Sequence, residues 1–258
     1  MNDSVATMDV PPTQAAGLGG KLRASPSSDG GIRAQVLEAV RGLAAYGLGP
    51  SIGGHVSIRV PGERKFYINA FDRTFEEMRL QDIALLDFDG NVLECETMVS
   101  LGQTFHHGIY QQRDDVNAIV HTHGFWLTAQ SAFGRPVRNL HNLCTYFDRR
   151  TCISPSDDFA AIGPALRRQD VAIIIPWHGA ITLGKDLASA ASLHVTLDYA
   201  ARLDVTLPAE TPVMPAHLCA EMQSVLARAN YLDVTWDLIR RKGVDNFDGQ
   251  RVIARMVN

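Results

Sequence analysis

The unbroken apolar run VAIIIP at residues 171–176 narrows the possible folds of this chain more than any other feature. A strand with one face in water alternates apolar and polar residues, whereas a strand without alternation is covered on both faces. The run therefore predicts a strand in a sheet with helices on both sides. Alternating stretches, HVSIRV at residues 55–60 and KFYIN at residues 65–69, predict two more strands, and the PGER between them predicts a turn.

Helical spacing of apolar residues occurs between and after the strand-like stretches. Residues 32–46, 103–112, 154–168 and 186–203 each predict a helix, and helical patterning returns from about His217. Strands and helices mixed in this order predict a single α/β domain with a central, largely antiparallel sheet flanked by helices. We expect a flexible N-terminal tail at residues 1–30, rich in Gly, Pro and Ser, the folded domain at 31–210 and a C-terminal helical extension at 211–258.

Composition limits the classes of partner. The 258 residues carry a formal net charge of -4 with dispersed basic residues, which argues against a nucleic-acid partner. No apolar run approaches the roughly 20 residues that span a bilayer, and we expect no membrane association. The four cysteines form no CxxC pair, which indicates reduced intracellular thiols. The N-terminus lacks the basic start and apolar middle of a signal peptide, so we expect a cytoplasmic protein.

Two histidines end an apolar run in VNAIVHTHGFW, at residues 116–126. Residues two apart in a strand point to the same side, so His121 and His123 would present both imidazoles to one place. Such a pair can also be a plain surface feature, and a metal site needs at least one more protein ligand. His178 is the candidate, because it too follows an apolar strand and precedes Gly179, which leaves room for close approach.

Longer motifs surround these histidines. GGHVSIRVP, LLDFDGNVLE, HHGIYQQRDDVNAIVHTHG and IIIPWHGAITLGKDLASAASLHVTLDYAA follow one another between residues 51 and 205. In order and spacing this region resembles the class II aldolase/adducin family, in which a central, largely antiparallel sheet is flanked by helices. The resemblance implies that residues 31–210 are a metal-binding domain with His121, His123 and His178 as ligands of a divalent cation. Zinc or Fe(II) is expected, with Mn or Co possible, in a homotetramer.

The chain departs from sugar-phosphate aldolases of that family at two places. Alignment on His106 puts Gly102 where those enzymes carry a proton-transferring Glu, and the neighbouring Gln103 cannot titrate at neutral pH. The residues that match the aldolase phosphate donors are Gly54-His55, about Asn69-Ala70, and Ser100-Leu101, which retain only fragments of that donor set. A phosphorylated sugar is therefore not the substrate that we expect.

The retained ligands and the missing acid leave three hypotheses open. The first is a metal-dependent lyase, of aldolase or decarboxylase type, that cleaves a C–C bond next to a carbonyl in a small non-phosphorylated oxo- or hydroxy-acid. The second is a non-haem Fe(II) oxygenase that oxidatively decarboxylates an aryl 2-oxo acid in secondary metabolism, as a few family relatives do. The third is a non-enzymatic scaffold like adducin, although adducin-type relatives have lost these ligands.

Candidate residues for the reaction follow from the same comparison. We expect Tyr146 or His106 to act as catalytic residue in place of the missing acid. His55, Asn69 and Gly102 are the expected substrate-binding positions.

Overall fold

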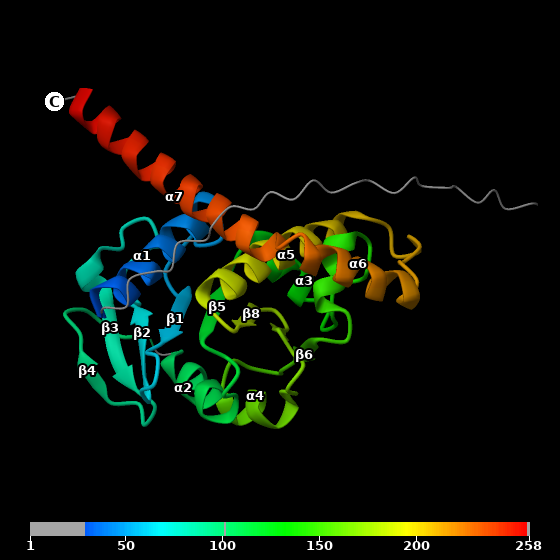
Figure 1. Cartoon of the computed structure of the whole chain (residues 1–258), viewed down its shortest axis with the longest axis horizontal. Helices are drawn as coiled ribbons and strands as arrows, with labels where there is room; N and C mark the ends of the chain where they lie inside the picture. The colour runs from blue at the N-terminus through cyan, green and yellow to red at the C-terminus, as the bar shows by residue number, and fades with distance from the viewer. Residues whose placement is uncertain (1–28, 101, 257–258) are drawn as a thin grey trace, which may run out of the picture.

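A single sheet of eight strands forms the centre of the computed structural model, which describes residues 29–100 and 102–256 (Figure 1). The strand order is β4-β3-β2-β1-β5-β8-β7-β6, and every neighbouring pair except β6 and β7 is antiparallel. The predicted α/β fold with a largely antiparallel sheet is thus confirmed. The strands are β1 (His55–Arg59), β2 (Lys65–Asn69), β3 (Ile83–Asp87), β4 (Val92–Glu94), β5 (Ala118–Thr122), β6 (Thr151–Ile153), β7 (Ala172–Ile175) and β8 (Gly179–Gly184).

Helices cover both faces of this sheet, as the apolar run at residues 171–176 predicts (Figure 1). Ile173 and Ile175 of β7 lie in the core under α2 and α4, whereas Ala172 and Ile174 lie in the core under the other helices. The helices are α1 (Asp29–Ala45), α2 (Gln103–Gln112), α3 (Phe125–Ser131), α4 (Phe159–Ala165), α5 (Leu187–Thr206), α6 (Ala216–Arg228) and α7 (Tyr231–Met256), with short 3-10 turns η1 (Leu80–Asp82) and η2 (Asn142–Phe147).

Two of the predicted element boundaries are wrong. Helix α4 begins at Phe159, later than the expected 154, because the Asp158 carboxylate accepts a hydrogen bond from the Ala160 N–H and caps the helix there. Helix α1 begins at Asp29, inside the expected tail of residues 1–30. The rest of that tail lies outside the described residues.

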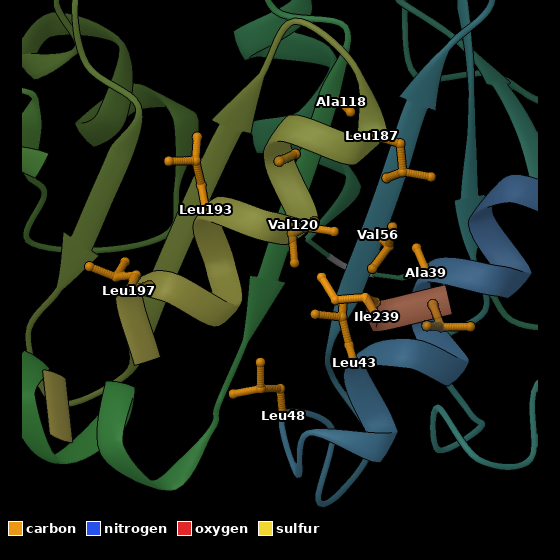
Figure 2. Close-up of a cluster of buried hydrophobic side chains, with 14 of the residues drawn as sticks. Ala39, Leu43, Leu48, Val56, Ala118, Val120, Leu187, Leu193, Leu197 and Ile239 are labelled. Atoms are coloured by element: carbon orange, nitrogen blue, oxygen red, sulfur yellow. The ribbon is translucent and has the colours of Figure 1, made fainter. Parts of the chain in front are cut away.

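The larger core lies between the sheet and the layer formed by α1, α5 and α7. Figure 2 shows part of it, where Val56 and Val120 of the sheet lie with Leu43 of α1. Burial of such side chains is the main stabilising contribution to a fold of this kind. No helix in the described part of the chain is long and apolar enough to cross a membrane.

The C-terminal helix α7 packs closely on α1. Ile239 is fully buried, and a Cβ atom at Gly42 would lie 2.3 Å from its Cγ2 atom. One turn further along α7, a Cβ atom at Gly243 would lie 3.0 Å from the Gly42 backbone nitrogen. The two helices therefore approach almost backbone to backbone, and glycine is needed on both sides of the contact.

His194 of α5 joins the helix layer to the neighbouring strands β5 and β8. Its Nε2 lies 2.8 Å from Thr122 Oγ1 of β5, and its Nδ1 lies 3.0 Å from Thr182 Oγ1 of β8. Burial, together with the nearby His123, lowers the pKa of His194 to about 3. Both ring nitrogens have partners, so His194 is a structural residue that fixes the strand carrying His121.

We expect His194 to make the stability of the protein depend on pH. The unfolded chain takes up a proton at this histidine below about pH 6.5, whereas the folded chain does not until about pH 3, so stability falls as the pH is lowered through this window. One such group contributes a slope of about 1.4 kcal/mol per pH unit. His194→Gln should be less stable at pH 7 but should lose that part of the slope when urea unfolding is measured at several pH values.

The matched control is His217→Gln on α6, because His217 is exposed. The dependence of the free energy of unfolding on pH should be the same in His217→Gln as in the wild type. Equal slopes in wild type and His194→Gln would show that His194 is protonated in the folded state, contrary to this prediction.

Candidate metal centre

Three histidines meet at the end of β5 and at the turn between β7 and β8. The Nε2 atom of His123 lies 3.0 Å from Nε2 of His121 and 2.8 Å from Nε2 of His178. All three ligand atoms lie within 4.8 Å of one another, and the described part of the chain holds no other group of this kind. The structure thus brings together the three residues that the sequence predicts as ligands.

One of these imidazoles is held in a fixed tautomer by the backbone. His121 Nδ1 donates to the carbonyl oxygen of Ala180 at 2.9 Å, so a neutral His121 carries a lone pair on Nε2. Burial holds the pKa of His121 well below its usual value, and the neighbouring His55 and His123 act in the same direction. Burial, with His178, also lowers the pKa of His123. Neutral imidazoles are the form that binds metals.

The spacing of the three nitrogens suits a shared cation. The single N–H that a neutral His123 can carry on Nε2 can donate to only one of its two neighbours. A cation with bonds of about 2.0–2.1 Å accepts all three lone pairs, and nitrogens that share it lie roughly 3 Å apart. The donor set therefore fits a divalent metal ion, and soft or borderline metals such as zinc and Fe(II) suit three imidazoles.

Two glycines give His123 its place. A Cβ atom at Gly179 would lie 2.6 Å from the Thr122 carbonyl oxygen and 3.5 Å from His123 Cδ2, so β8 approaches the end of β5 only without a side chain there. On the other side, Gly53 has φ +96, and a Cβ atom there would lie 3.3 Å from His123 Cε1. The close approach that the sequence suggests for Gly179 is present in the structure.

Two aromatic side chains close in sequence to the ligands are exposed to solvent. Trp177, next to His178 in the turn, is 81% exposed and has a left-handed backbone with φ 59, which costs a non-glycine residue roughly 1–2 kcal/mol. Phe125, two residues after His123, is 71% exposed. Two exposed aromatic residues are therefore close in sequence to two of the ligands.

His55 lies beside the three histidines without joining them. It is paired across β1 and β5 with His121, and the two ring centroids are 5.3 Å apart. Its Nε2 lies 2.5 Å from Ser100 Oγ, and the Gly102 N–H donates to the same oxygen at 3.1 Å. Burial holds the pKa of His55 well below its usual value, with His106 and His123 acting in the same direction. Both His55 and Gly102, two of the expected substrate-binding positions, therefore lie next to the centre.

The expectation that Asn69 binds substrate is not supported by its contacts. The Asn69 side chain is fully buried, its Oδ1 accepts from the Val56 N–H at 2.6 Å, and its Nδ2 donates to Gly54 O at 2.9 Å and to Ala70 O at 3.0 Å. Its amide hydrogens are therefore used by the backbone on either side of His55. Asn69 positions His55 rather than a ligand.

His106, one of the two expected catalytic residues, lies behind this group. It is fully buried on α2, its Nδ1 lies 2.7 Å from Ser57 Oγ, and Ser57 Oγ in turn lies 2.7 Å from Tyr110 OH. Its ring meets that of His55 at a centroid distance of 5.6 Å. His106 therefore supports His55 from inside the core and has no open path to a substrate.

Tyr146, the other expected catalytic residue, is not brought to the centre. It lines a cavity of about 330 Å³ together with Val116 and Gly184. Val116 precedes β5 and Gly184 ends β8, on the side of these strands away from His121. Along the strands Val116 lies roughly 15 Å and Gly184 roughly 10 Å from the level of His121. Burial, with Tyr231, raises the pKa of Tyr146 to about 12. Within one chain Tyr146 thus lies away from the three histidines, and its catalytic role stays a prediction.

The sequence interpretation overlooked Asp157. This half-buried residue follows β6, and its charge acts on His123, where it opposes the lowering of the pKa. Strands β6 and β7 are parallel, so their carboxyl ends, followed by Asp157 and His178, meet at one edge of the sheet. Assigning residues 154–168 to a helix hid this signal.

Comparison with known proteins agrees with this geometry. The family described as "Class II Aldolase and Adducin N-terminal domain" matches residues 34–205. An L-fuculose phosphate aldolase of Methanococcus maripaludis is 30% identical over 158 residues, which cover 59% of this chain and 83% of the relative. The meiotically up-regulated gene 14 protein of Schizosaccharomyces pombe is 25% identical over 186 residues, covering 68% and 72%.

Solved structures share the fold. An L-fuculose 1-phosphate aldolase from Glaciozyma antarctica superposes with a TM-score of 0.78 and covers 89% of this chain and 96% of its own. Its sequence identity is 22%, so this likeness concerns the fold. An aldolase II superfamily protein from Pseudomonas syringae superposes with a TM-score of 0.72 at 23% identity, covering 85% and 96%.

Proposed function

Because this chain belongs to the class II aldolase and adducin family, we propose that it is a divalent-metal-dependent lyase that cleaves a C–C bond next to a carbonyl. The observation that carries the proposal is the meeting of the His121, His123 and His178 nitrogens, with the His121 lone pair fixed toward the other two. A retained ligand set of this geometry has no use in a scaffold of adducin type.

The substrate that we propose is a small, non-phosphorylated 2-oxo or 2-hydroxy acid, cleaved by an aldolase or decarboxylase reaction. Two of the residues that match the aldolase phosphate donors are already occupied within the chain. The amide of Asn69 bonds to the backbone, and the hydroxyl of Ser100 bonds to His55 and to the Gly102 N–H. These groups are therefore not free to hold a phosphate.

When bound by the three histidines, the cation would polarise the substrate carbonyl as a Lewis acid. The chain itself supplies the fixed imidazoles, with His121 oriented by Ala180 O. The enolate left by bond cleavage must take up a proton. Because His106 is buried and Tyr146 lies away from the centre, we assign that proton to water.

Product analysis of the metal-loaded protein tests this proposal. We expect cleavage of at least one acid from a panel of non-phosphorylated 2-oxo and 2-hydroxy acids, followed by NMR, and no cleavage of L-fuculose 1-phosphate, the substrate named for two relatives. Cleavage of the sugar phosphate alone would overturn the substrate class and keep the lyase. Absence of any cleavage with Zn, Fe(II), Mn or Co would contradict the lyase.

A second candidate is an Fe(II) oxygenase that acts on an aryl 2-oxo acid. The exposed rings of Trp177 and Phe125 favour it, because these residues are next to His178 and two residues after His123 in the sequence, and an aryl group can stack on an exposed ring. This alternative predicts oxygen consumption when the iron-loaded protein, reconstituted without air, meets an aryl 2-oxo acid. No uptake across a panel of such acids would exclude it.

We expect a cytoplasmic homotetramer that acts on small molecules. Sedimentation at micromolar concentration measures the assembly.

A further inference from the structure

The imidazole of His55 occupies the space that a side chain at residue 102 would need. A Cβ atom at Gly102 would lie 2.2 Å from His55 Cε1, 2.6 Å from His55 Nδ1 and 3.0 Å from Phe105 Cε1. Carbon atoms do not approach so closely, so residue 102 can carry no side chain while His55 keeps this position. Gly102 is the position at which the family resemblance expects an acid. His55 and Gly102 therefore form one complementary pair.

The hydrogen bonds around Ser100 favour one tautomer of His55. Ser100 Oγ accepts from the Gly102 N–H, and its own hydrogen has His55 Nε2 as its acceptor among the described groups. A neutral His55 that accepts at Nε2 carries its hydrogen on Nδ1. Residue 55 thus presents an N–H donor on the side that faces position 102.

That donor finds no partner in the described part of the chain. His55 is 5% exposed, and Nδ1 is among the buried polar atoms without a hydrogen bond. An unpaired buried donor costs about 1–3 kcal/mol, so such an atom calls for a ligand or an ordered water. The unpaired His106 Nε2 lies in the neighbouring ring, at a centroid distance of 5.6 Å.

The place of His55 suits a contact with substrate rather than with the cation. It stands opposite His121 across two strands, yet it is not a member of the group of nitrogens that could share a metal ion. A substrate held at His121, His123 and His178 would therefore have His55 at its side.

We propose that His55 takes over the substrate-contacting place of the missing acid, where its Nδ1–H donates a hydrogen bond to an oxygen of an anionic substrate. This inference rests on the proposed metal-dependent function. A neutral donor stabilises the negative oxygen that develops when a C–C bond breaks. A carboxylate at residue 102 would repel a substrate that itself carries a carboxylate. The exchange of an acid for His55 and Gly102 thus selects 2-oxo and 2-hydroxy acids.

Oxalate binding to the Co²⁺-loaded protein tests the donor, since oxalate resembles the enolate of a 2-oxo acid. His55→Phe keeps a ring beside Gly102 and removes the N–H. We expect wild type and His55→Phe to bind one Co²⁺ per chain alike, but the variant to bind oxalate about 10-fold more weakly or worse, as for a lost hydrogen bond to a charged group. The double variant His55→Asn/Gly102→Glu, which restores an acid, should bind oxalate more weakly than His55→Asn alone.

The possible failures are distinguishable. Absence of Co²⁺ binding by the wild type would overturn the proposed function. Normal Co²⁺ binding with equal oxalate affinity in wild type and His55→Phe would overturn the role of His55 alone. Failure of the wild type to bind oxalate would also overturn it, because the inferred substrates are acids.

Thermal unfolding tests the complementary pair without any ligand. Gly102→Ala should lower Tm by a few degrees, because the new methyl group meets the His55 ring. In a His55→Ala background the same substitution should change Tm little. Equal decreases in the two backgrounds would show that the ring and residue 102 do not compete for space.

Discussion

His178→Ala is expected to abolish metal binding and turnover together. His178 supplies one of three nitrogens and stands at a turn rather than in the core, so its removal should leave the fold intact. Loss of a ligand should weaken metal affinity by at least about 100-fold, because even mutation of a residue that only hydrogen-bonds to a ligand lowers metal affinity about 10–100-fold. Elemental analysis after anaerobic purification should find about one metal ion per wild-type chain and almost none in the variant.

The matched control is His217→Ala, which removes an exposed histidine from α6. It should keep the wild-type metal content. Full metal content in His178→Ala, with circular dichroism unchanged, would mean that these histidines are not the ligands. The element found in the wild type also separates the two enzymatic hypotheses, since iron favours the oxygenase and zinc the lyase.

Asp204→Asn is expected to destabilise the protein by about 1.5–3 kcal/mol, the range for hydrogen bonds to a charged group, because Asp204 is buried whereas its partner Arg135 is 40% exposed. The Asp204 side chain is fully buried and lies 2.6 Å from Arg135 and 2.5 Å from Arg138. Burial alone would raise the pKa of Asp204, but the hydrogen bonds from both arginines lower it. The amide would leave two guanidinium groups without their counter-charge.

Arg138 increases the effect because it also binds the end of α5. Arg138 Nη2 donates hydrogen bonds to the carbonyl oxygens of Asp204 and Leu207, at 3.1 Å each. The control is Asp114→Asn, whose partner Arg168 is exposed, and it should cost less than about 1 kcal/mol in urea unfolding. Similar small decreases in the free energy of unfolding in both variants would show that the ion pairs of Asp204 contribute little to stability.

The fold was largely predictable because its strongest signals are local. The uniform apolar run of β7 reflects cover on both faces, and the His-x-His spacing survives in three dimensions because His121 still belongs to β5. His178 could be predicted as the third ligand from its motif, because the end of β5 and the turn after β7 lie at the same edge of the sheet.

The remaining site residues depend on contacts that no local pattern reports. Asn69 matches a donor position, but its amide turns toward the backbone of β1. Tyr146 lies in a segment that seemed close to the centre, but it is placed at the other end of the strands. The fit of the His55 ring over Gly102 joins two distant positions, and only the structure relates them.

The contact of α1 with α7 extends the folding unit of this chain beyond the segment that the family model matches. The family match ends at residue 205, whereas Ile239 of α7 fills the space over Gly42 of α1. A shortened chain that stops at residue 205 would leave the buried face of α1, including Val40 and Leu43, without this cover. The family model thus covers the residues of the candidate metal centre. The backbone contact at Gly42 and Gly243 shows that α7 must also be synthesised before the domain that holds this centre is stable.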